Sequence, residues 1–181
     1  MSTLTTALTT WEEFVELPDP EDGYRYELHD GEVISIAPSK PIHVLIRHRL
    51  TKSLNIQAQG RGDADTKFPY RPARNMQYWQ ADIAYLPKED WRAMDTDDYI
   101  IYAPPLVIEV LSPSNRPEKI RRQRLAAFSG GTREFWVVDP DARTIEVSVP
   151  GATSRVYREQ ETVPVNVLPG IMLPVRAVFE D

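Results

Sequence analysis

A short apolar segment with one acidic residue inside it constrains this chain more than any other stretch. Residues 106–111 read LVIEVL and lie between Pro105 and Pro113. Such a run, rich in β-branched residues and bounded by prolines, predicts a central strand that is covered on both faces. An ionised carboxylate buried in this strand is costly unless it has a partner. Glu109 is therefore expected to meet a cation, a basic side chain or a water-filled cleft at the end of the sheet.

Length and charge bound the kind of protein that surrounds this strand. The chain has 181 residues, 41% of them hydrophobic, which is enough for one buried core. Because no linker is evident, we expect a single domain over residues 1–181. The 21 lysines and arginines against 27 aspartates and glutamates give a net charge of −6. This balance excludes a large basic surface, so any contact with nucleic acid must be local.

Cysteine usage and hydropathy indicate the compartment. The sequence has no cysteine, which excludes disulfides, thiolate metal sites and cysteine nucleophiles and fits a reducing environment. Residues 1–10 lack the basic and apolar regions of a secretory signal. No apolar run approaches the roughly 20 residues that a membrane helix requires. These features predict a soluble cytoplasmic protein without membrane contact.

The remaining sequence alternates strand patterns with helical ones. A capping pattern at Thr9 or Thr10 predicts a short helix from Trp11, and Asp30-Gly31 predicts the turn of a hairpin. Apolar spacing and turn residues predict the other elements, which are a helix from Pro41 to near Gly60, strands at 63–70 and 78–86, a short helix at 88–94, a basic helix at 118–129, strands at 133–138 and 144–149, and short β-like pieces after 151 whose last part packs along an edge. This order indicates a mixed α/β fold.

Polar residues in the hairpin and in the first long helix have a structural and a functional interpretation. Strict alternation puts Arg25, Glu27 and His29 on one face of the hairpin, and an exposed polar face would produce the same pattern. In the helix from Pro41, a lone His43 near the N-terminal end is expected to be structural. The basic residues of this helix, which include Arg47, are expected to be solvated.

Strand 78–86 repeats the feature that marks Glu109. Asp82 is a single acid among small and apolar residues, and alternation places Trp79, Ala81, Ile83 and Tyr85 on the opposite face. The same alternation allows Asp82 and Glu109 to face the same side of neighbouring strands.

A local excess of positive charge follows Glu109. Between Arg116 and Arg124 the sequence has five basic residues and one acid, against the negative charge of the whole chain. A solvated helix face would explain this pattern. At about 100° per residue, however, Gln123 and Arg124 lie within about 60° of Ile120 on the inward side. The helix is therefore expected to lie over the sheet edge beside Glu109.

Three carboxylates on three predicted strands suit a metal site. Mg²⁺ binds oxygen ligands, commonly one or two protein carboxylates with waters and substrate phosphates. Glu27, Asp82 and Glu109 would supply such ligands, and the site would activate a water for attack on a phosphodiester. Structural ion pairs are the alternative interpretation of acids in apolar strands.

Five segments of the sequence carry a recognisable pattern, which are YELHDGE at 26–32, PSKPIH at 38–43, QADIAY at 80–85, PLVIEVLSPSN at 105–115 and REFWVVDP at 133–140. In their order and approximate spacing they resemble the Uma2 family of the PD-(D/E)XK nuclease superfamily. The resemblance covers roughly residues 10 to 175, and the segment around Glu109 is its most specific part. It implies a restriction-endonuclease-like fold, with a mixed central sheet flanked by helices. The implied activity is Mg²⁺-dependent cleavage of DNA, with Mn²⁺ as a substitute.

The resemblance also implies roles for individual residues. Asp82 matches the aspartate of the superfamily motif and Glu109 matches the acid of the next strand, so these two are the implied metal ligands. Glu27 matches the acid of the family's YEL motif, and is implied as an outer ligand or as a residue that holds water. The superfamily's lysine would stand at Leu111, and relatives have moved it to the next helix, where this chain has Gln123.

The displaced lysine is the main departure from the family pattern. A neutral amide at Gln123 can orient a water, but it cannot stabilise developing negative charge as an ammonium does. Lys119, about 40° around the helix from Gln123, and the adjacent Arg124 are the other candidates for this role. Ala81, where the superfamily has proline, is a milder departure. The resemblance therefore leaves the metal ligands in place and the activating residue open.

Three functions are consistent with the sequence. The first is a DNA endonuclease in which Asp82 and Glu109 bind Mg²⁺. Gln123 or Lys119 then positions the water or the phosphate, and the basic cluster of residues 116–124 grips the DNA backbone. The second is a catalytically degenerate module on the same fold that binds nucleic acid or a protein partner. The third is hydrolysis of RNA or another phosphodiester. A homodimer would suit cleavage of both DNA strands, although the sequence contains no dimer motif.

Overall fold

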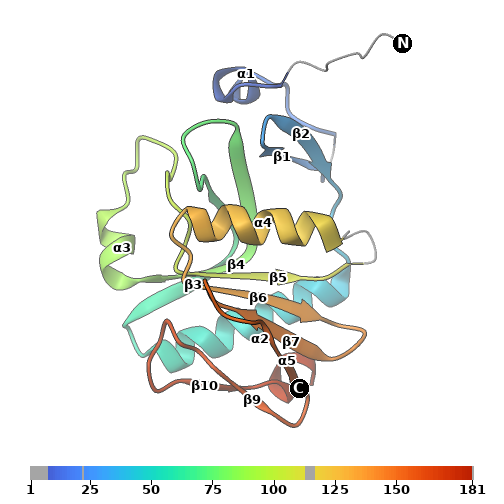
Figure 1. Cartoon of the computed structure of the whole chain (residues 1–181), viewed down its shortest axis with the longest axis vertical. Helices are drawn as coiled ribbons and strands as arrows, with labels where there is room; N and C mark the ends of the chain where they lie inside the picture. Colours follow the sequence, from blue (N-terminus) through green and yellow to red (C-terminus); the bar gives the residue numbers. More distant parts are fainter. Residues whose placement is uncertain (1–7, 22, 113–116, 181) are drawn as a thin grey trace.

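A mixed sheet of eight strands forms the centre of the structure, a computed structural model that describes residues 8–21, 23–112 and 117–180 (Figure 1). The strand order is β2-β1-β4-β5-β6-β7-β8, and β3 pairs with β4 outside this path. The β5–β6 pair is parallel and the other pairs are antiparallel. The strands of this sheet are β1 (Arg25–His29), β2 (Glu32–Ile36), β3 (Gly62–Tyr70), β4 (Gln77–Pro87), β5 (Leu106–Val110), β6 (Glu134–Asp139), β7 (Thr144–Ser148) and β8 (Arg155–Arg158). The predicted mixed α/β fold is confirmed.

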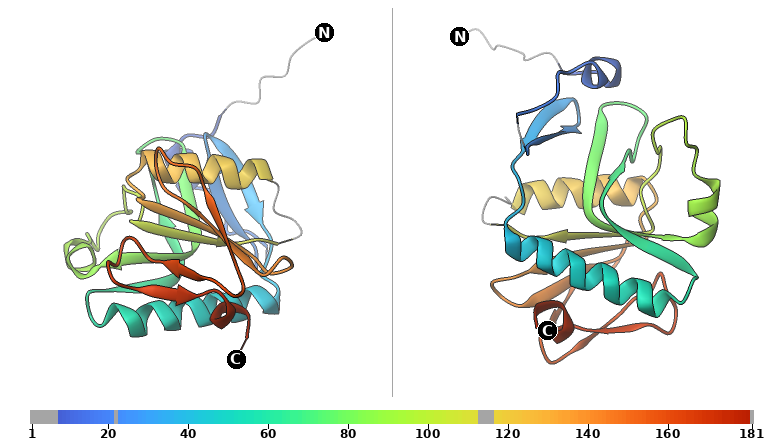
Figure 2. Two further views of the ribbon diagram at one scale, coloured as in Figure 1. Left: turned by 60° about the horizontal axis from the view of Figure 1, so that its bottom comes forward. Right: turned by 180° about the vertical axis from the view of Figure 1, so that it is seen from behind.

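Helices cover both faces of the sheet. The helices are α1 (Trp11–Val15), α2 (Pro41–Ala58), α3 (Lys88–Ala93), α4 (Pro117–Ser129) and α5 (Arg176–Phe179). Helix α2 packs on one face through Ile46, Leu50 and Leu54, and α4 packs on the other through Ile120 and Ala127. Figure 2 shows the sheet between these two helices. Since β5 lies in the middle of the sheet, both of its faces are buried, as the apolar run 106–111 predicts.

Local sequence signals act as expected in the N-terminal part. Thr10 caps α1, where its Oγ1 accepts a hydrogen bond from Glu13 N at 3.2 Å and its N donates to Glu13 Oε2 at 2.8 Å, a capping box. The β1–β2 turn has Asp30 at a φ of 53° and Gly31 at 83°. A two-residue hairpin turn of this type needs positive φ at both positions. The Asp-Gly pair therefore fixes the register of the hairpin.

Alternation along β4 breaks at Asp82, and the predicted division of its faces is wrong. Trp79 and Ala81 belong to the core under α4, whereas Ile83 and Tyr85 belong to the core under α2. In the β3–β4 register Asp82 has no partner. The β3 residue at this point is Lys67, which has a φ of 54°. An irregular pair of residues reverses the faces of a strand, because side chains alternate only along regular β-structure.

The last two strands do not extend the main sheet. Strands β9 (Thr162–Pro164) and β10 (Met172–Pro174) pair with each other in a separate two-stranded sheet, so the prediction that this segment packs along an edge is wrong. Val163 and Leu173 are fully buried in the core that also contains the apolar face of α2. This small sheet therefore closes the α2 side of the core. Within the described residues, no helix has the length and apolar character needed to cross a bilayer.

Candidate functional site

Asp82 and Glu109 meet where β4 and β5 separate. The two strands pair only over residues 83–85 and 106–108. Beyond that point Asp82 Oδ2 accepts a hydrogen bond from Val110 N at 2.9 Å, and Asp82 N donates to Glu109 Oε1 at 3.2 Å. Each acid thus takes the place of a missing strand partner. The predicted proximity of these two acids is confirmed. Because the strands separate here, each acid side chain bonds to the backbone of the other strand.

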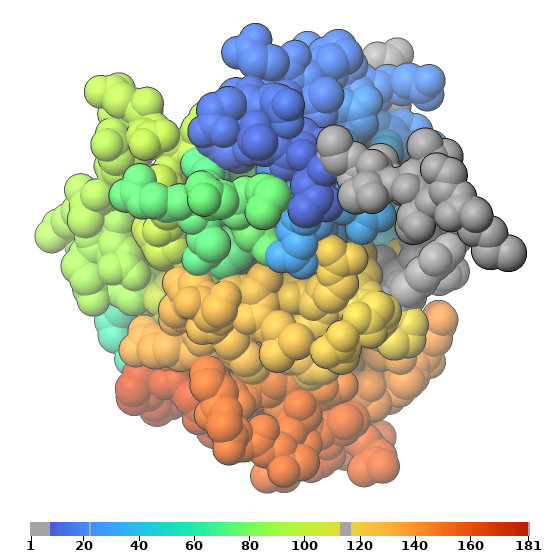
Figure 3. Space-filling view, turned by 45° about the horizontal axis from the view of Figure 1, so that its top comes forward, coloured from blue at the N-terminus to red at the C-terminus, as the bar shows by residue number. Residues whose placement is uncertain are grey.

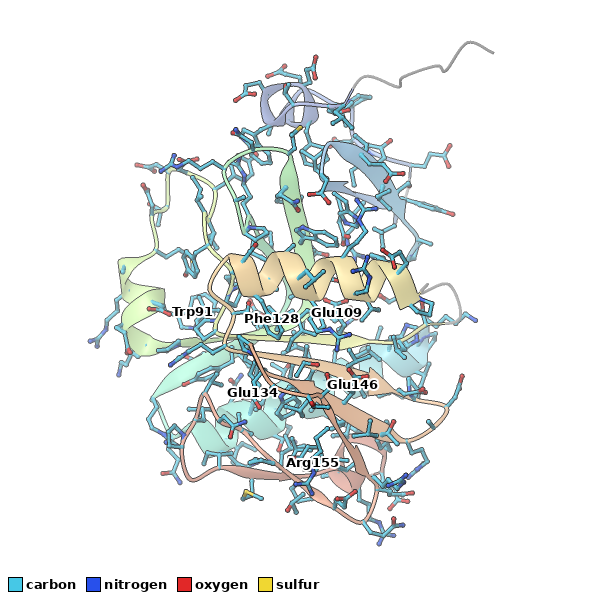
Figure 4. The ribbon with its side chains drawn as sticks, viewed as in Figure 1. Trp91, Glu109, Phe128, Glu134, Glu146 and Arg155 are labelled. Atoms are coloured by element: carbon cyan, nitrogen blue, oxygen red, sulfur yellow. The ribbon has the colours of Figure 1, made fainter. Side chains whose placement is uncertain are left out.

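Glu109 lies under α4 and is almost completely buried (Figure 4). Its Oε1 also accepts a hydrogen bond from Gln123 Nε2 at 2.7 Å, so α4 lies over Glu109 as its apolar positions predicted. Burial, followed by the negative charge of Asp82, raises the pKa of Glu109 well above its usual range, and the charge of Lys119 opposes this shift. The positive charge of Lys119 therefore only partly offsets the effects of burial and of Asp82 on this pKa.

Helix α2 supplies two side chains that the sequence analysis placed elsewhere. Arg47 is only 5% exposed, and its Nη1 donates to Asp82 Oδ1 and to Ser39 Oγ, each at 2.9 Å. The expectation of a solvated Arg47 is therefore wrong. A usable signal was present, since Arg47 lies within about 20° of Leu54 on a helical wheel. His43 is also buried, which lowers its pKa, and it forms a hydrogen bond with the backbone of Leu111.

Glu27 lies in a second polar cluster beside the first. It is 1% exposed, and its carboxylate contacts His29 Nε2 at 2.8 Å, Arg25 Nη2 at 3.2 Å and Lys119 Nζ at 3.4 Å. Burial raises the pKa of Glu27, but the hydrogen bond from His29 and the charges of Lys119 and Arg25 outweigh it and lower the pKa overall. Burial lowers the pKa of His29, which stacks on Trp79 at 3.5 Å. The interpretation of Glu27 and His29 as an exposed face is wrong.

Tyr70 is a further buried group at this site, and the sequence analysis gave it no role. Burial and the charge of Glu109 raise its pKa well above the usual range, while the neighbouring Gln123 opposes this shift. Among the described residues, neither the Tyr70 hydroxyl nor Gln123 Oε1 has a hydrogen-bond partner. Both atoms are fully buried, so each retains capacity for a water or a ligand.

The basic residues of α4 are largely engaged with acids of the same chain. Arg121 pairs with Glu118, Arg122 pairs with Asp30 and Glu32, and Arg124 pairs with Glu146 at 2.5 Å. Arg124 is therefore engaged with β7, whereas Lys119 reaches Glu27. Figure 3 shows α4 on the surface between the N-terminal part and the β7–β8 part. Arg116, which begins the predicted basic cluster, lies outside the described residues.

The acid pair is chemically suited to a divalent cation. In the ranges that the structure describes, no group of three or more histidine, aspartate or glutamate residues is arranged to hold a metal ion. Mg²⁺ needs only one or two protein carboxylates when water and substrate complete its shell. Asp82 and Glu109 supply oxygen donors, and Glu109 has a raised pKa that a nearby cation would lower. The residues present therefore fit Mg²⁺ or Mn²⁺, while Glu27 is already held by three basic groups.

The raised pKa of Glu109 predicts how stability depends on pH without metal. Between its ordinary value of 4.5 and its raised value in the fold, the unfolded chain has released a proton that the folded chain retains. The contribution of Glu109 to stability is therefore fully present below about pH 4.5 and is lost as pH rises through the pKa of this group in the folded protein. Urea unfolding in EDTA should show this decrease, and Glu109→Gln should reduce it. Equal slopes for both proteins would contradict the pKa shift.

A mixed sheet with helices on both faces and an acid pair at the end of a central strand defines a restriction-endonuclease-like protein. The family model of Uma2, described as "Putative restriction endonuclease", matches residues 11–176, and the chain belongs to this family. Its structure is similar to the crystal structure of a "putative nuclease" from Anabaena variabilis, with a TM-score of 0.80 and 22% identity over 93% of this chain and 96% of that one. This likeness supports the fold. No curated protein matches the sequence. The predicted family and fold class are confirmed.

Proposed function

We propose that this protein is a metal-dependent DNA endonuclease, formed by one domain over residues 1–181. The observation that carries the proposal is the pairing of Asp82 and Glu109, since Asp82 N donates to Glu109 Oε1 while Asp82 itself is anchored on Val110 N. A rigid pair of oxygen donors of this kind is suited to Mg²⁺, or to Mn²⁺ in its place. Family membership supports the same class of reaction.

Asp82 and Glu109 would hold the cation, which when bound supplies Lewis acidity toward a phosphoryl oxygen and lowers the pKa of a water. Gln123 would orient Glu109, because its amide donates to Oε1 at 2.7 Å. Lys119 would supply positive charge beside the scissile phosphate, since its side chain is 25% exposed. Its ammonium lowers the pKa of Glu109 and contacts Glu27. Glu27 would thereby position Lys119 and act as an outer group of the site.

Nicking of supercoiled plasmid by the purified protein tests the proposal. Cleavage with Mg²⁺ or Mn²⁺ that stops in EDTA is the expected result. Single-stranded RNA added as a competitor separates a DNA nuclease from an enzyme that acts on RNA. Absence of nicking with either metal, together with absence of Mn²⁺ binding by calorimetry, would contradict the proposal.

Gln123→Lys is expected to leave nicking unchanged or to raise it up to about tenfold, because an ammonium beside Glu109 favours its ionised form and stabilises negative charge. The rate of plasmid nicking at fixed Mg²⁺ measures this effect. Gln123→Met is the matched control, since it keeps the side-chain length but cannot donate to Glu109, and it should lower the rate. Complete loss of nicking in Gln123→Lys would show that the amide has a specific role of its own.

A degenerate binding module is the second candidate function. The observation in its favour is that Glu109 Oε1 accepts a hydrogen bond from the neutral amide of Gln123 and not from an ammonium. Such a module would retain the fold and bind nucleic acid or a protein partner without metal. Binding of DNA in a gel-shift assay in EDTA, without nicking in Mg²⁺ or Mn²⁺, would favour this function.

A further inference from the structure

The candidate site contains a buried cation that belongs to the chain itself. Arg47 Nη1 lies 2.9 Å from Asp82 Oδ1, and the side chains of the two residues are 6% and 15% exposed. The Coulomb attraction between charges this well shielded from water is larger than between charges on the surface. Asp82 is therefore neutralised by Arg47 in the protein without metal.

We propose that Arg47 is an exchangeable counter-ion: it leaves Asp82 Oδ1 when a divalent cation binds there, and its guanidinium then binds a phosphate of the substrate. The second step rests on the proposed nuclease function, whereas the first does not. Arg47 would thereby supply the positive charge that the displaced lysine of the family does not supply in this chain.

Competition for one oxygen supports the first step. Oδ2 of Asp82 accepts a hydrogen bond from Val110 N at 2.9 Å, so that, among the described residues, Oδ1 is the oxygen without a backbone donor. Oδ1 is the atom that Arg47 holds. A guanidinium and a divalent cation repel each other, so binding of the second weakens the hold of the first on this oxygen.

The surroundings of Arg47 support the second step. Its backbone is fixed in the middle of α2, where the neighbouring Ile46 and Leu50 are completely buried. The side chain also donates to Ser39 Oγ at 2.9 Å, so a guanidinium released from Asp82 remains at this end of the sheet. The planar guanidinium carries several N–H donors that match phosphate oxygens.

Calorimetric titration with Mn²⁺ tests the exchange. Arg47→Met should bind Mn²⁺ at least about tenfold more tightly than the parent, because the competing charge is gone while most of the side-chain volume remains. Arg143→Met is the control, since Arg143 pairs with Glu159 and Glu180 outside the site, and its affinity should equal that of the parent. Unchanged or weaker binding by a folded Arg47→Met, or no binding by either protein, would overturn the exchange.

Plasmid nicking tests the second step with the same variant. Arg47→Met should nick at least about tenfold more slowly at saturating Mn²⁺ despite its tighter binding of the metal. An equal or higher rate would overturn phosphate binding by Arg47. Tighter Mn²⁺ binding by the variant with no nicking by the parent would support the exchange and contradict the nuclease function, so the two failures are distinguishable.

A measurement on the parent protein covers the case in which Arg47→Met does not fold. The side-chain N–H resonance of Arg47, assigned by its loss in Arg47→Lys, should shift when Mg²⁺ is added. An unchanged resonance at a Mg²⁺ concentration that shifts the backbone amide of Val110 would overturn the exchange.

Discussion

Replacement of Glu109 by glutamine is expected to reduce metal-dependent plasmid nicking at least about 100-fold, to background. The substitution removes one of two carboxylates that would hold the cation, at nearly constant shape. An amide oxygen in the same position can still accept from Asp82 N, which Glu109 Oε1 now does at 3.2 Å. Because the buried carboxyl already has a raised pKa, its loss should cost little or no stability. The loss of activity should therefore occur in a folded protein.

The measurement is the nicking rate in Mg²⁺ and in Mn²⁺, together with circular dichroism and thermal unfolding of the same samples. Glu146→Gln is a matched control, since Glu146 lies on β7 and pairs with Arg124 away from the acid pair. It should nick at the parent rate. If Glu109→Gln also nicked at the parent rate, Glu109 would not be a metal ligand.

Glu134→Ala is expected to lower the free energy of unfolding by about 3–4 kcal/mol. Glu134 is completely buried on β6, one strand away from Glu109 (Figure 4). Its carboxyl accepts from Trp136 Nε1 at 2.9 Å, Asn166 Nδ2 at 3.1 Å and Val167 N at 3.2 Å. Removal of this acceptor leaves three donors without a partner and opens a cavity, and each effect destabilises the folded state. Urea unfolding monitored by tryptophan fluorescence measures the loss.

Glu134→Gln separates the two contributions. It keeps the volume and one acceptor oxygen, so its cost should be only about 1 kcal/mol. Nicking by this milder variant should remain normal, because Glu134 contacts the segment before β10 and not the acid pair. A loss below about 1 kcal/mol in Glu134→Ala would mean that water replaces the carboxyl at little cost.

Several parts of the fold follow from the sequence because their causes are local. The capping box of Thr10 and Glu13 involves residues three positions apart, and the turn at Asp30 and Gly31 depends on the backbone freedom of two residues. The apolar run 106–111 predicts a strand that is buried on both faces. A carboxylate within such a run is expensive without a partner, so the same run also indicated that Glu109 belongs to a site.

The partners of that carboxylate depend on the tertiary structure. Asp82 and Glu109 meet where β4 leaves β5 after a three-residue pairing. At the same residue the β3–β4 pairing is irregular, which the alternation of the sequence does not show. Arg47 reaches Asp82 across 35 positions of the chain. Periodicity places Arg47 on the inward side of its helix, but it does not say which strand end that side covers.

The sequence by itself therefore determined the elements, the family and the two acids that carry the proposed chemistry, because these depend on residue type and short spacing. Only the tertiary structure decided which acid each basic side chain near the site meets. It directs Arg124 to Glu146, Lys119 to Glu27 and Arg47 to Asp82. Ion pairs between distant residues form where packing brings helices and strand ends together, and that packing is a property of the whole core.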